Sequence, residues 1–126
     1  MSRDIADGFV EALRKLEQER DVEALVETHT DDCEVGNVAV PETSEGHEGL
    51  REFWTEYCKT FGEMESTFRN VFATEEGAAL GWTTRGTSNG GDVSYDGVSI
   101  LELDGDKISR FMAYFDTGSL TRQVVY

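Results

Sequence analysis

The chain is 126 residues long, the usual length of one domain, and we expect residues 1–126 to fold as a single unit. It carries 26 acidic residues against 11 basic ones, a net charge of -15. That balance excludes nucleic acids and anionic membrane surfaces as partners, because both are bound through clustered lysine and arginine.

The acidic residues are spread along the chain, and the lysines are few: Lys15, Lys59 and Lys107. Dispersed carboxylates keep a surface hydrated and high salt screens their repulsion, so this composition is typical of a halophile with a salt-rich cytoplasm. The sequence holds no apolar run long enough to span a membrane, and residues 1–20 lack the apolar core of a signal peptide. We therefore expect a cytoplasmic protein.

The first half of the chain predicts helices. Over residues 3–19 apolar side chains recur at helical spacing, namely Ile5, Phe9, Leu13 and Leu16. A short second helix is expected after Asp21, then a strand near residues 33–38 and a polar loop after Pro41. A third helix over residues 47–61 carries a stronger apolar stripe, made of Leu50, Phe53, Trp54, Tyr57 and Phe61.

The second half predicts strands. The β-rich segments cover residues 66–74, 78–88, 93–103 and 107–116. Glycine-containing stretches separate them and can form hairpin turns, at Glu76-Gly77, Asn89-Gly90-Gly91 and Asp104-Gly105. Strands joined in this way form an antiparallel meander, and helices followed by a meander indicate an α+β fold. Residues 117–126 are expected to form a short tail packed on the domain.

The last predicted strand is apolar on both sides, because Ile108, Met112 and Tyr114 alternate with Phe111, Ala113 and Phe115. A strand of this kind is normally buried on both faces. Helices cover only one face, so a second copy of the sheet is the simplest cover for the other, which predicts a homodimer packed through its sheets. The alternative is that the C-terminal tail covers this face alone.

Several stretches carry a family likeness: DVEAL, TDDCEV, GHEGLREFW, YDGVSILELDGDKI and YFD. Together they resemble the SnoaL-like group of the nuclear-transport-factor-2-like superfamily over nearly the whole chain. The resemblance implies a cone-shaped α+β barrel, in which a strongly curved antiparallel sheet wraps the N-terminal helices and leaves a pocket for a small molecule. The superfamily includes polyketide cyclases, ketosteroid isomerases, limonene-epoxide hydrolases, dehydratases and many non-enzymes, so the resemblance implies the fold more closely than the function.

Asp116 ends the last predicted strand. Residues two apart on a strand share a face, so we expect Asp116 to share a face with Tyr114, Met112 and Ile108. The resemblance implies that the aspartate of the YFD motif points into the pocket, where an apolar environment makes a carboxylate a better base. The alternative is that Asp116 caps a turn that begins at Thr117.

Arg85 is the basic residue of the second predicted strand. Facing inward it would pair with Asp116, and facing outward it would be solvated. In the limonene-epoxide hydrolases the arginine is followed two residues later by a second aspartate, whereas this sequence has Thr87. The arrangement of two acids and one arginine is incomplete, which argues against epoxide hydrolysis.

His29 follows the second helix and is interpreted either as an acid–base group or as a packed structural histidine. The candidate walls of a pocket, or alternatively of the core, are Trp54, Tyr57, Trp82, Met112 and Tyr114. The spacing of a metal site and the motifs that bind dinucleotides or phosphates do not occur in the sequence, so we expect neither a metal nor a cofactor.

Three functions remain open. The first is a proton-transfer enzyme of the isomerase, cyclase or dehydratase type, with Asp116 as the base and Tyr114 or His29 as donor to an oxyanion on a small, largely apolar substrate. The second is a module that binds a metabolite without reacting with it. The third is an association domain that works through its sheet face.

Overall fold

The computed structural model describes residues 2–124. The helices are α1 (Ser2–Glu19), α2 (Glu23–Val26), α3 (Gly46–Thr60) and α4 (Thr117–Val124). The strands are β1 (His29–Asn37), β2 (Ser44–Glu45), β3 (Met64–Ala73), β4 (Gly77–Ser88), β5 (Gly91–Asp104) and β6 (Lys107–Phe115). This is the predicted α+β fold, with two additions: the expected C-terminal tail forms helix α4 through residue 124, and the expected polar loop after Pro41 contains the short strand β2.

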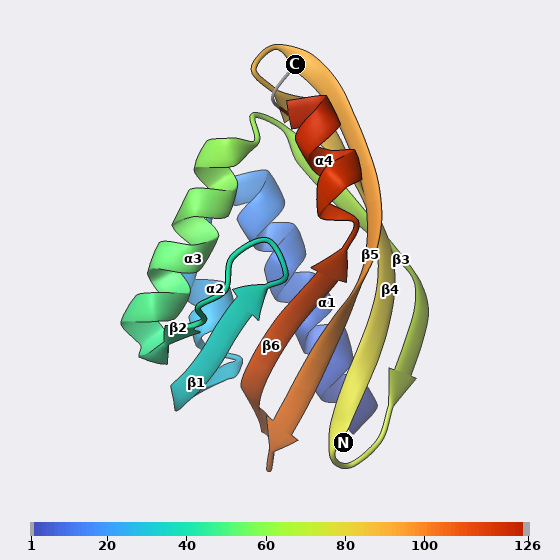
Figure 1. The fold of residues 1–126 in the computed structure, drawn as a ribbon. Helices are drawn as coiled ribbons and strands as arrows, with labels where there is room; N and C mark the ends of the chain where they lie inside the picture. Colours follow the sequence, from blue (N-terminus) through green and yellow to red (C-terminus); the bar gives the residue numbers. More distant parts are fainter. Residues whose placement is uncertain (1, 125–126) are drawn as a thin grey trace.

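The strands form one sheet in the order β2-β1-β6-β5-β4-β3. Strands β3 to β6 are the predicted antiparallel meander. Strand β1 joins the sheet beside β6 in parallel orientation, with Val35 opposite Phe111, so the sheet is mixed. Figure 1 shows the long strands β4 and β5 curving past α1 and α3, which lie on one side of the sheet, with α4 across one end.

The core lies between the helices and the concave face of the sheet. The apolar stripe of α1 is buried there, with Phe9 and Leu16 each 1% exposed. Its partners across the core include Leu25, Leu50, Trp54, Leu80, Leu101 and Phe111. The apolar side chains that recur at helical spacing and those on the inner face of the strands therefore pack in one continuous core.

Both faces of strand β6 are apolar, and the structure buries one of them against the helices. Phe111 and Ala113 are buried against the helices, whereas Tyr114 is 45% exposed on the opposite face. Ile108 is also buried, because the register of β5 and β6 shifts between Glu102 and Leu103. On the outer face of the sheet, opposite α1 and α3, the large apolar side chains of Val98 and Tyr114 therefore stay exposed among the described residues.

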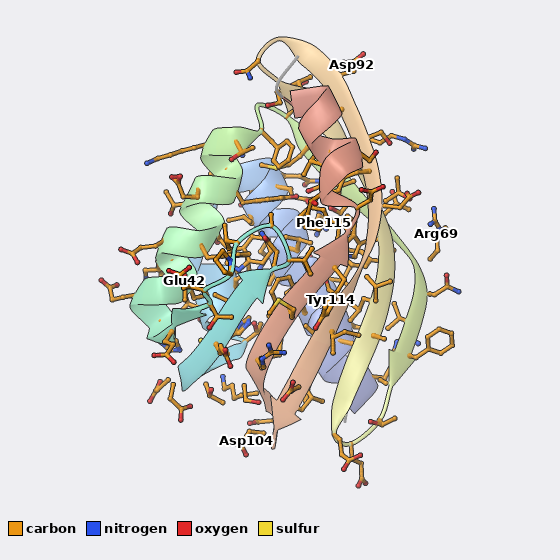
Figure 2. All side chains as sticks on the ribbon, viewed as in Figure 1. Glu42, Arg69, Asp92, Asp104, Tyr114 and Phe115 are labelled. Carbon is orange, nitrogen blue, oxygen red and sulfur yellow. The ribbon has the colours of Figure 1, made fainter. Side chains whose placement is uncertain are left out.

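The acidic residues are not confined to one region of the structure. Figure 2 shows Glu42, Asp92 and Asp104 at widely separated positions, each in or beside a different connection between strands. Within residues 2–124 every helix is too short or too polar to cross a membrane.

Candidate functional site

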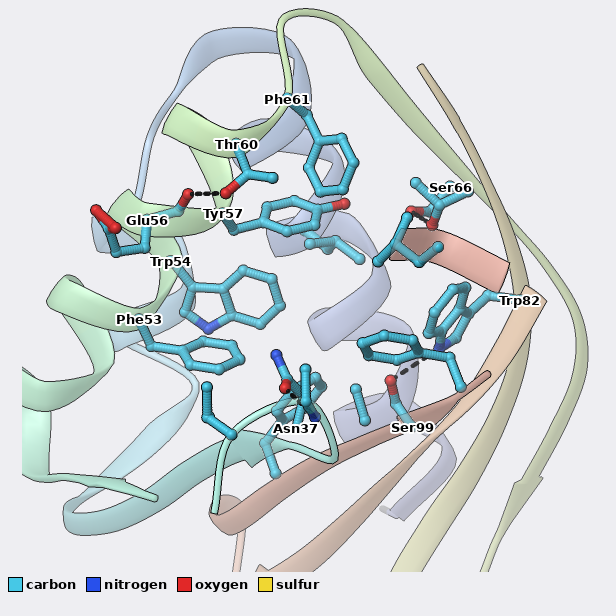
Figure 3. Close-up of a pocket in the computed structure, with 18 of the residues that line it drawn as sticks. Asn37, Phe53, Trp54, Glu56, Tyr57, Thr60, Phe61, Ser66, Trp82 and Ser99 are labelled. Atoms are coloured by element: carbon cyan, nitrogen blue, oxygen red, sulfur yellow. Dashed lines mark hydrogen bonds between the residues drawn. The ribbon is translucent and has the colours of Figure 1, made fainter. Parts of the chain in front are cut away.

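A cavity of about 500 Å³ lies between α3 and the inner face of the sheet. Its lining is mainly aromatic and consists in large part of Phe9, Phe53, Trp54, Tyr57, Phe61, Trp82, Tyr95, Phe111 and Phe115. Figure 3 shows the side chains of α3 facing Trp82 and Ser99 across the cavity. A space of this size and composition suits a small organic molecule.

The aromatic walls contact one another from helix to sheet. Helical spacing puts Trp54, Tyr57 and Phe61 on the side of α3 that faces the strands. The ring centroid of Tyr57 lies 5.3 Å from that of Phe61, which lies 6.0 Å from that of Tyr95. Tyr95 in turn contacts Phe115 at 5.4 Å. These ring contacts fix the positions of the walls.

Trp82 of β4 lies directly over Gly97 of β5, its partner in the antiparallel pair. A Cβ atom added at position 97 would lie 2.5 Å from the indole ring, so only glycine leaves room for it. The indole N–H donates a hydrogen bond to the hydroxyl oxygen of Ser99 at 2.9 Å. The orientation of the Trp82 ring is therefore set by the space that Gly97 leaves and by the buried hydrogen bond to Ser99.

A buried carboxylate lies behind the wall formed by Tyr57. Glu17 of α1 is 8% exposed, and its Oε2 accepts hydrogen bonds from the hydroxyls of Tyr57 at 3.0 Å and Ser66 at 2.6 Å. Its Oε1 accepts the backbone N–H of Ser66 at 2.9 Å. The hydroxyl oxygens of Ser66 and Thr84 lie 2.7 Å apart. We call these four residues the Glu17 network, which joins a buried charge to three side chains that line the cavity.

Both tyrosines near Glu17 hold their protons strongly. Burial raises the pKa of Tyr57 well above its usual value, and the charge of Glu17 raises it further. Burial followed by the same charge raises the pKa of Tyr95. Both phenols are therefore neutral at physiological pH and act as hydroxyl groups rather than phenolates.

Other polar groups lie around the cavity. The amide oxygen of Asn37 accepts the backbone N–H of Ala39 at 2.8 Å, which leaves the amide nitrogen directed toward the cavity (Figure 3). The exposed Glu52 and Glu56 of α3 also border it. Among the lining residues that the structure describes, none is basic.

Asp116 lies outside the cavity. It is exposed and caps α4, where its side chain accepts the backbone N–H of Ser119 at 3.2 Å and its carbonyl accepts that of Leu120 at 3.2 Å. Its predicted position inside the pocket is therefore wrong, and the alternative interpretation as a cap is confirmed. The physical reason is that the first turn of α4 offers free N–H groups directly beside the carboxylate.

The other residues expected beside Asp116 also face outward. Tyr114 and Met112 lie on the outer face of the sheet, because Phe111, Ala113 and Phe115 occupy the inner one. Arg85 is exposed on β4 opposite Glu65 and Ser94, so it belongs to the solvated alternative. By contrast, Trp54, Tyr57 and Trp82 do line the cavity.

His29 is 2% exposed at the start of β1 and does not line the cavity. Its Nδ1 lies 2.9 Å from the carbonyl oxygen of Leu25, so Nδ1 carries the proton, and Nε2 is buried without a partner in the described part of the chain. Burial lowers the pKa of His29 to about 4, the Leu25 hydrogen bond opposes the shift, and nearby His47 adds to it. These contacts match a packed structural histidine and contradict a place in the pocket.

The sequence reasoning did not select several residues of the site, among them Tyr95, Ser66 and Thr84 of the cavity lining and Glu17 behind it. Glu17 follows Leu13 by four positions, so it occupies a place on the buried stripe of α1 where an apolar residue is expected. A charged residue at such a place is the signal that could have identified it. In the described part of the chain, no group of three or more His, Cys, Asp or Glu side chains is placed to hold a metal ion.

Solved structures with this architecture include TerC, co-crystallised with polyporic acid, which is 20% identical with a TM-score of 0.85 and coverage of 98% of both chains. A nuclear-transport-factor-2-like protein of unknown function from Burkholderia pseudomallei is 18% identical, with a TM-score of 0.86 and coverage of 98% of this chain and 97% of that one. An LEH-like epoxide hydrolase from M. tuberculosis is 18% identical, with a TM-score of 0.74 and coverage of 98% and 91%. At these identities the likeness shows the fold alone.

No curated protein matches the sequence. The family model of the SnoaL-like domain matches residues 7–111, a range that begins in the second turn of α1 and ends at the centre of β6. That range contains every strand of the sheet at least in part, and most of the cavity wall. The chain therefore belongs to the SnoaL-like domain family.

Proposed function

We propose that this protein binds a small, flat, largely apolar molecule in the cavity between α3 and the sheet. The observation that carries the proposal is the open space of about 500 Å³ among aromatic side chains. A domain that served only for association would gain stability by filling this space, because an empty apolar cavity loses packing energy. The co-crystallisation of the similar TerC with polyporic acid supports an organic ligand.

Proton transfer of the isomerase, cyclase or dehydratase type is the second candidate. Asp116 cannot serve it from its exposed position, since a general base must lie within hydrogen-bond reach of the substrate. Glu17 instead supplies a carboxylate beside the cavity, where its Oε2 accepts the hydroxyl hydrogen of Tyr57 at 3.0 Å. Ligand binding remains the first candidate function, because Glu17 itself is not among the residues that line the cavity.

Filling the cavity should abolish binding while leaving the fold intact. Ala113→Phe places a ring in the space, because Ala113 lies on the inner face of β6 among the lining residues. We expect the affinity for the neutral fluorophore aminoanthracene to fall by at least about tenfold, which corresponds to about 1.4 kcal/mol. Energy transfer from Trp54 and Trp82 to the bound probe measures the affinity, and far-ultraviolet circular dichroism checks the fold.

The matched control is Thr55→Phe, which adds the same ring on the exposed side of α3. This control should bind the probe like the wild type. Equal binding by the wild type, the control and Ala113→Phe would place the probe elsewhere and overturn the proposed pocket. Mass spectrometry of protein purified in high salt would then identify any natural ligand that remains bound.

We further propose a homodimer through the outer face of the sheet, in the cytoplasm of a cell with high internal salt. The patch formed by Val98, Ile100, Met112 and Tyr114 supports it, because these neighbouring side chains of β5 and β6 share the outer face of the sheet, opposite α1 and α3. Val98 and Tyr114 are 40% and 45% exposed, which is unusual for adjacent large apolar residues.

Sedimentation in molar potassium chloride should give a particle of twice the 14.0 kDa chain mass. Tyr114→Glu brings like charges together at the proposed contact and should yield the single chain. Thr55→Glu makes the same charge change on α3 and should leave the dimer intact. A wild-type particle of 14.0 kDa would refute the dimer.

A further inference from the structure

The Glu17 network has a defined hydrogen-bond direction. The hydroxyls of Tyr57 and Ser66 and the backbone N–H of Ser66 all donate to the Glu17 carboxylate. Ser66 donates its only hydroxyl hydrogen to Glu17, so in the contact between the two hydroxyls Thr84 must be the donor and Ser66 the acceptor. Every hydroxyl hydrogen in the network is therefore committed inside the wall.

The cavity side of the same wall is left with acceptors. The oxygens of Tyr57 and Thr84 each keep lone pairs that no described hydrogen bond uses, and both residues line the cavity. Burial keeps Tyr57 protonated, so its hydrogen bond to Glu17 persists at neutral pH. A ligand group placed against this wall must consequently donate hydrogen bonds rather than accept them.

The charge of the site also favours a ligand group that donates hydrogen bonds, in particular a cationic one. Glu17 is 8% exposed and forms no ion pair with a basic side chain among residues 3–120, whose side chains the structure describes. The other charged residues that line the cavity are Glu52 and Glu56, and they have the same sign. The faces of aromatic rings also attract cations through their quadrupoles. The charges of the described lining residues and of Glu17 therefore all favour a cation in the cavity.

We propose that the Glu17 network is a recognition site for a protonated amine carried on an aromatic or cyclic body that fills the cavity. This inference rests on the proposed ligand-binding function and specifies the chemical class of the ligand. The ammonium group donates to the oxygens of Tyr57 and Thr84 and compensates the charge of Glu17 behind them. The apolar body packs between the rings of α3 and those of the sheet.

The test compares three compounds that share one ring system: naphthylmethylamine, naphthylmethanol and naphthoate. Their affinities are measured by displacement of bound aminoanthracene at neutral pH and constant high salt. We expect the amine to bind at least about tenfold more tightly than the alcohol, because a hydrogen bond with a charged donor exceeds one between neutral groups by about this factor. The carboxylate should bind weakest of the three.

Glu17→Gln then removes the charge with little change of shape. It should reduce the preference of the amine over the alcohol to about threefold or less, and this ratio of two affinities, measured within the one variant, is the readout. Glu19→Gln, two residues further along α1 on its exposed side, makes the same change in net charge and should keep the full preference. This control separates the local effect of Glu17 from the general attraction of an acidic protein for cations.

The outcomes are distinguishable. If none of the three compounds displaces the probe, and Ala113→Phe binds the probe like the wild type, the proposed pocket function fails as a whole. If the alcohol or the carboxylate binds as tightly as the amine, the pocket stands and the amine site is overturned. If Glu17→Gln does not fold, the ranking of the three compounds on the wild type decides the question alone.

Discussion

Truncating Phe111 to alanine will lower the free energy of unfolding by about 3–5 kcal/mol, as expected for a large aromatic residue removed from a core. Phe111 is 2% exposed and stacks on Phe9 with ring centroids 5.4 Å apart. It also contacts Trp54 at 5.3 Å and Phe53 at 6.2 Å. Phe111 thus joins α1, α3 and β6 at one point. Urea denaturation at constant salt measures the loss.

The control for this variant is Phe72→Ala on β3, where the side chain is 67% exposed. The same truncation there should change the free energy of unfolding by less than about 1 kcal/mol, since most of its area already contacts water. The melting temperature of Phe111→Ala should fall by roughly 10–20 °C for a domain of this size. Similar losses for the two variants would mean that Phe111 does not join the helices to the sheet.

Acid will destabilise the fold through His29. Its pKa is about 4 in the folded protein, below the ordinary value of 6.5, because burial disfavours the charged ring. The unfolded chain takes up the proton first, so the folded state loses stability as the pH falls from about 6.5 to about 4. The loss approaches about 1.4 kcal/mol for each pH unit and totals about 3 kcal/mol. Above pH 6.5 this contribution is fully present.

The variant His29→Asn isolates that proton. An amide can still donate to the carbonyl of Leu25, the partner of Nδ1, but does not titrate. Plotted against pH, the free energy of unfolding of the variant should fall less steeply than that of the wild type between pH 6.5 and 4. Carboxylates whose pKa values are lowered by ion pairs, such as Glu23 beside Arg51, affect both proteins equally. Parallel curves would contradict the role of His29.

The elements that were predicted from sequence are those with a strong local pattern. The stripe of α3 needs only the spacing of Phe53, Trp54 and Tyr57, and the hairpins need only their glycines. Helix α4 was expected as a tail because its segment is short and contains Gly118, which weakens a helix. Its cap at Asp116 and its position against β5 supply what its own sequence lacks.

The site was only partly predictable, because alternation along a strand does not say which face lies inside. Both faces of β6 are apolar, and the choice of Phe111, Ala113 and Phe115 for the interior moved Tyr114 and Asp116 out of the cavity. Glu17 was missed for a different reason. Its role depends on Tyr57 and Ser66, which lie far along the chain and meet it only in the fold.

The parallel pairing of β1 with β6 has a consequence for how the chain folds. Val35 of β1 pairs with Phe111 of β6, although the two residues lie in the first and last thirds of the chain. This edge of β1 therefore has no partner strand until β6 has formed. Contacts between such distant segments form late, since closing a long loop must precede any gain from the pairing. Before that step the edge of β1 and the aromatic side of α3 remain open to water and to other chains. We therefore expect the completion of the sheet and the formation of the cavity to be a single late event.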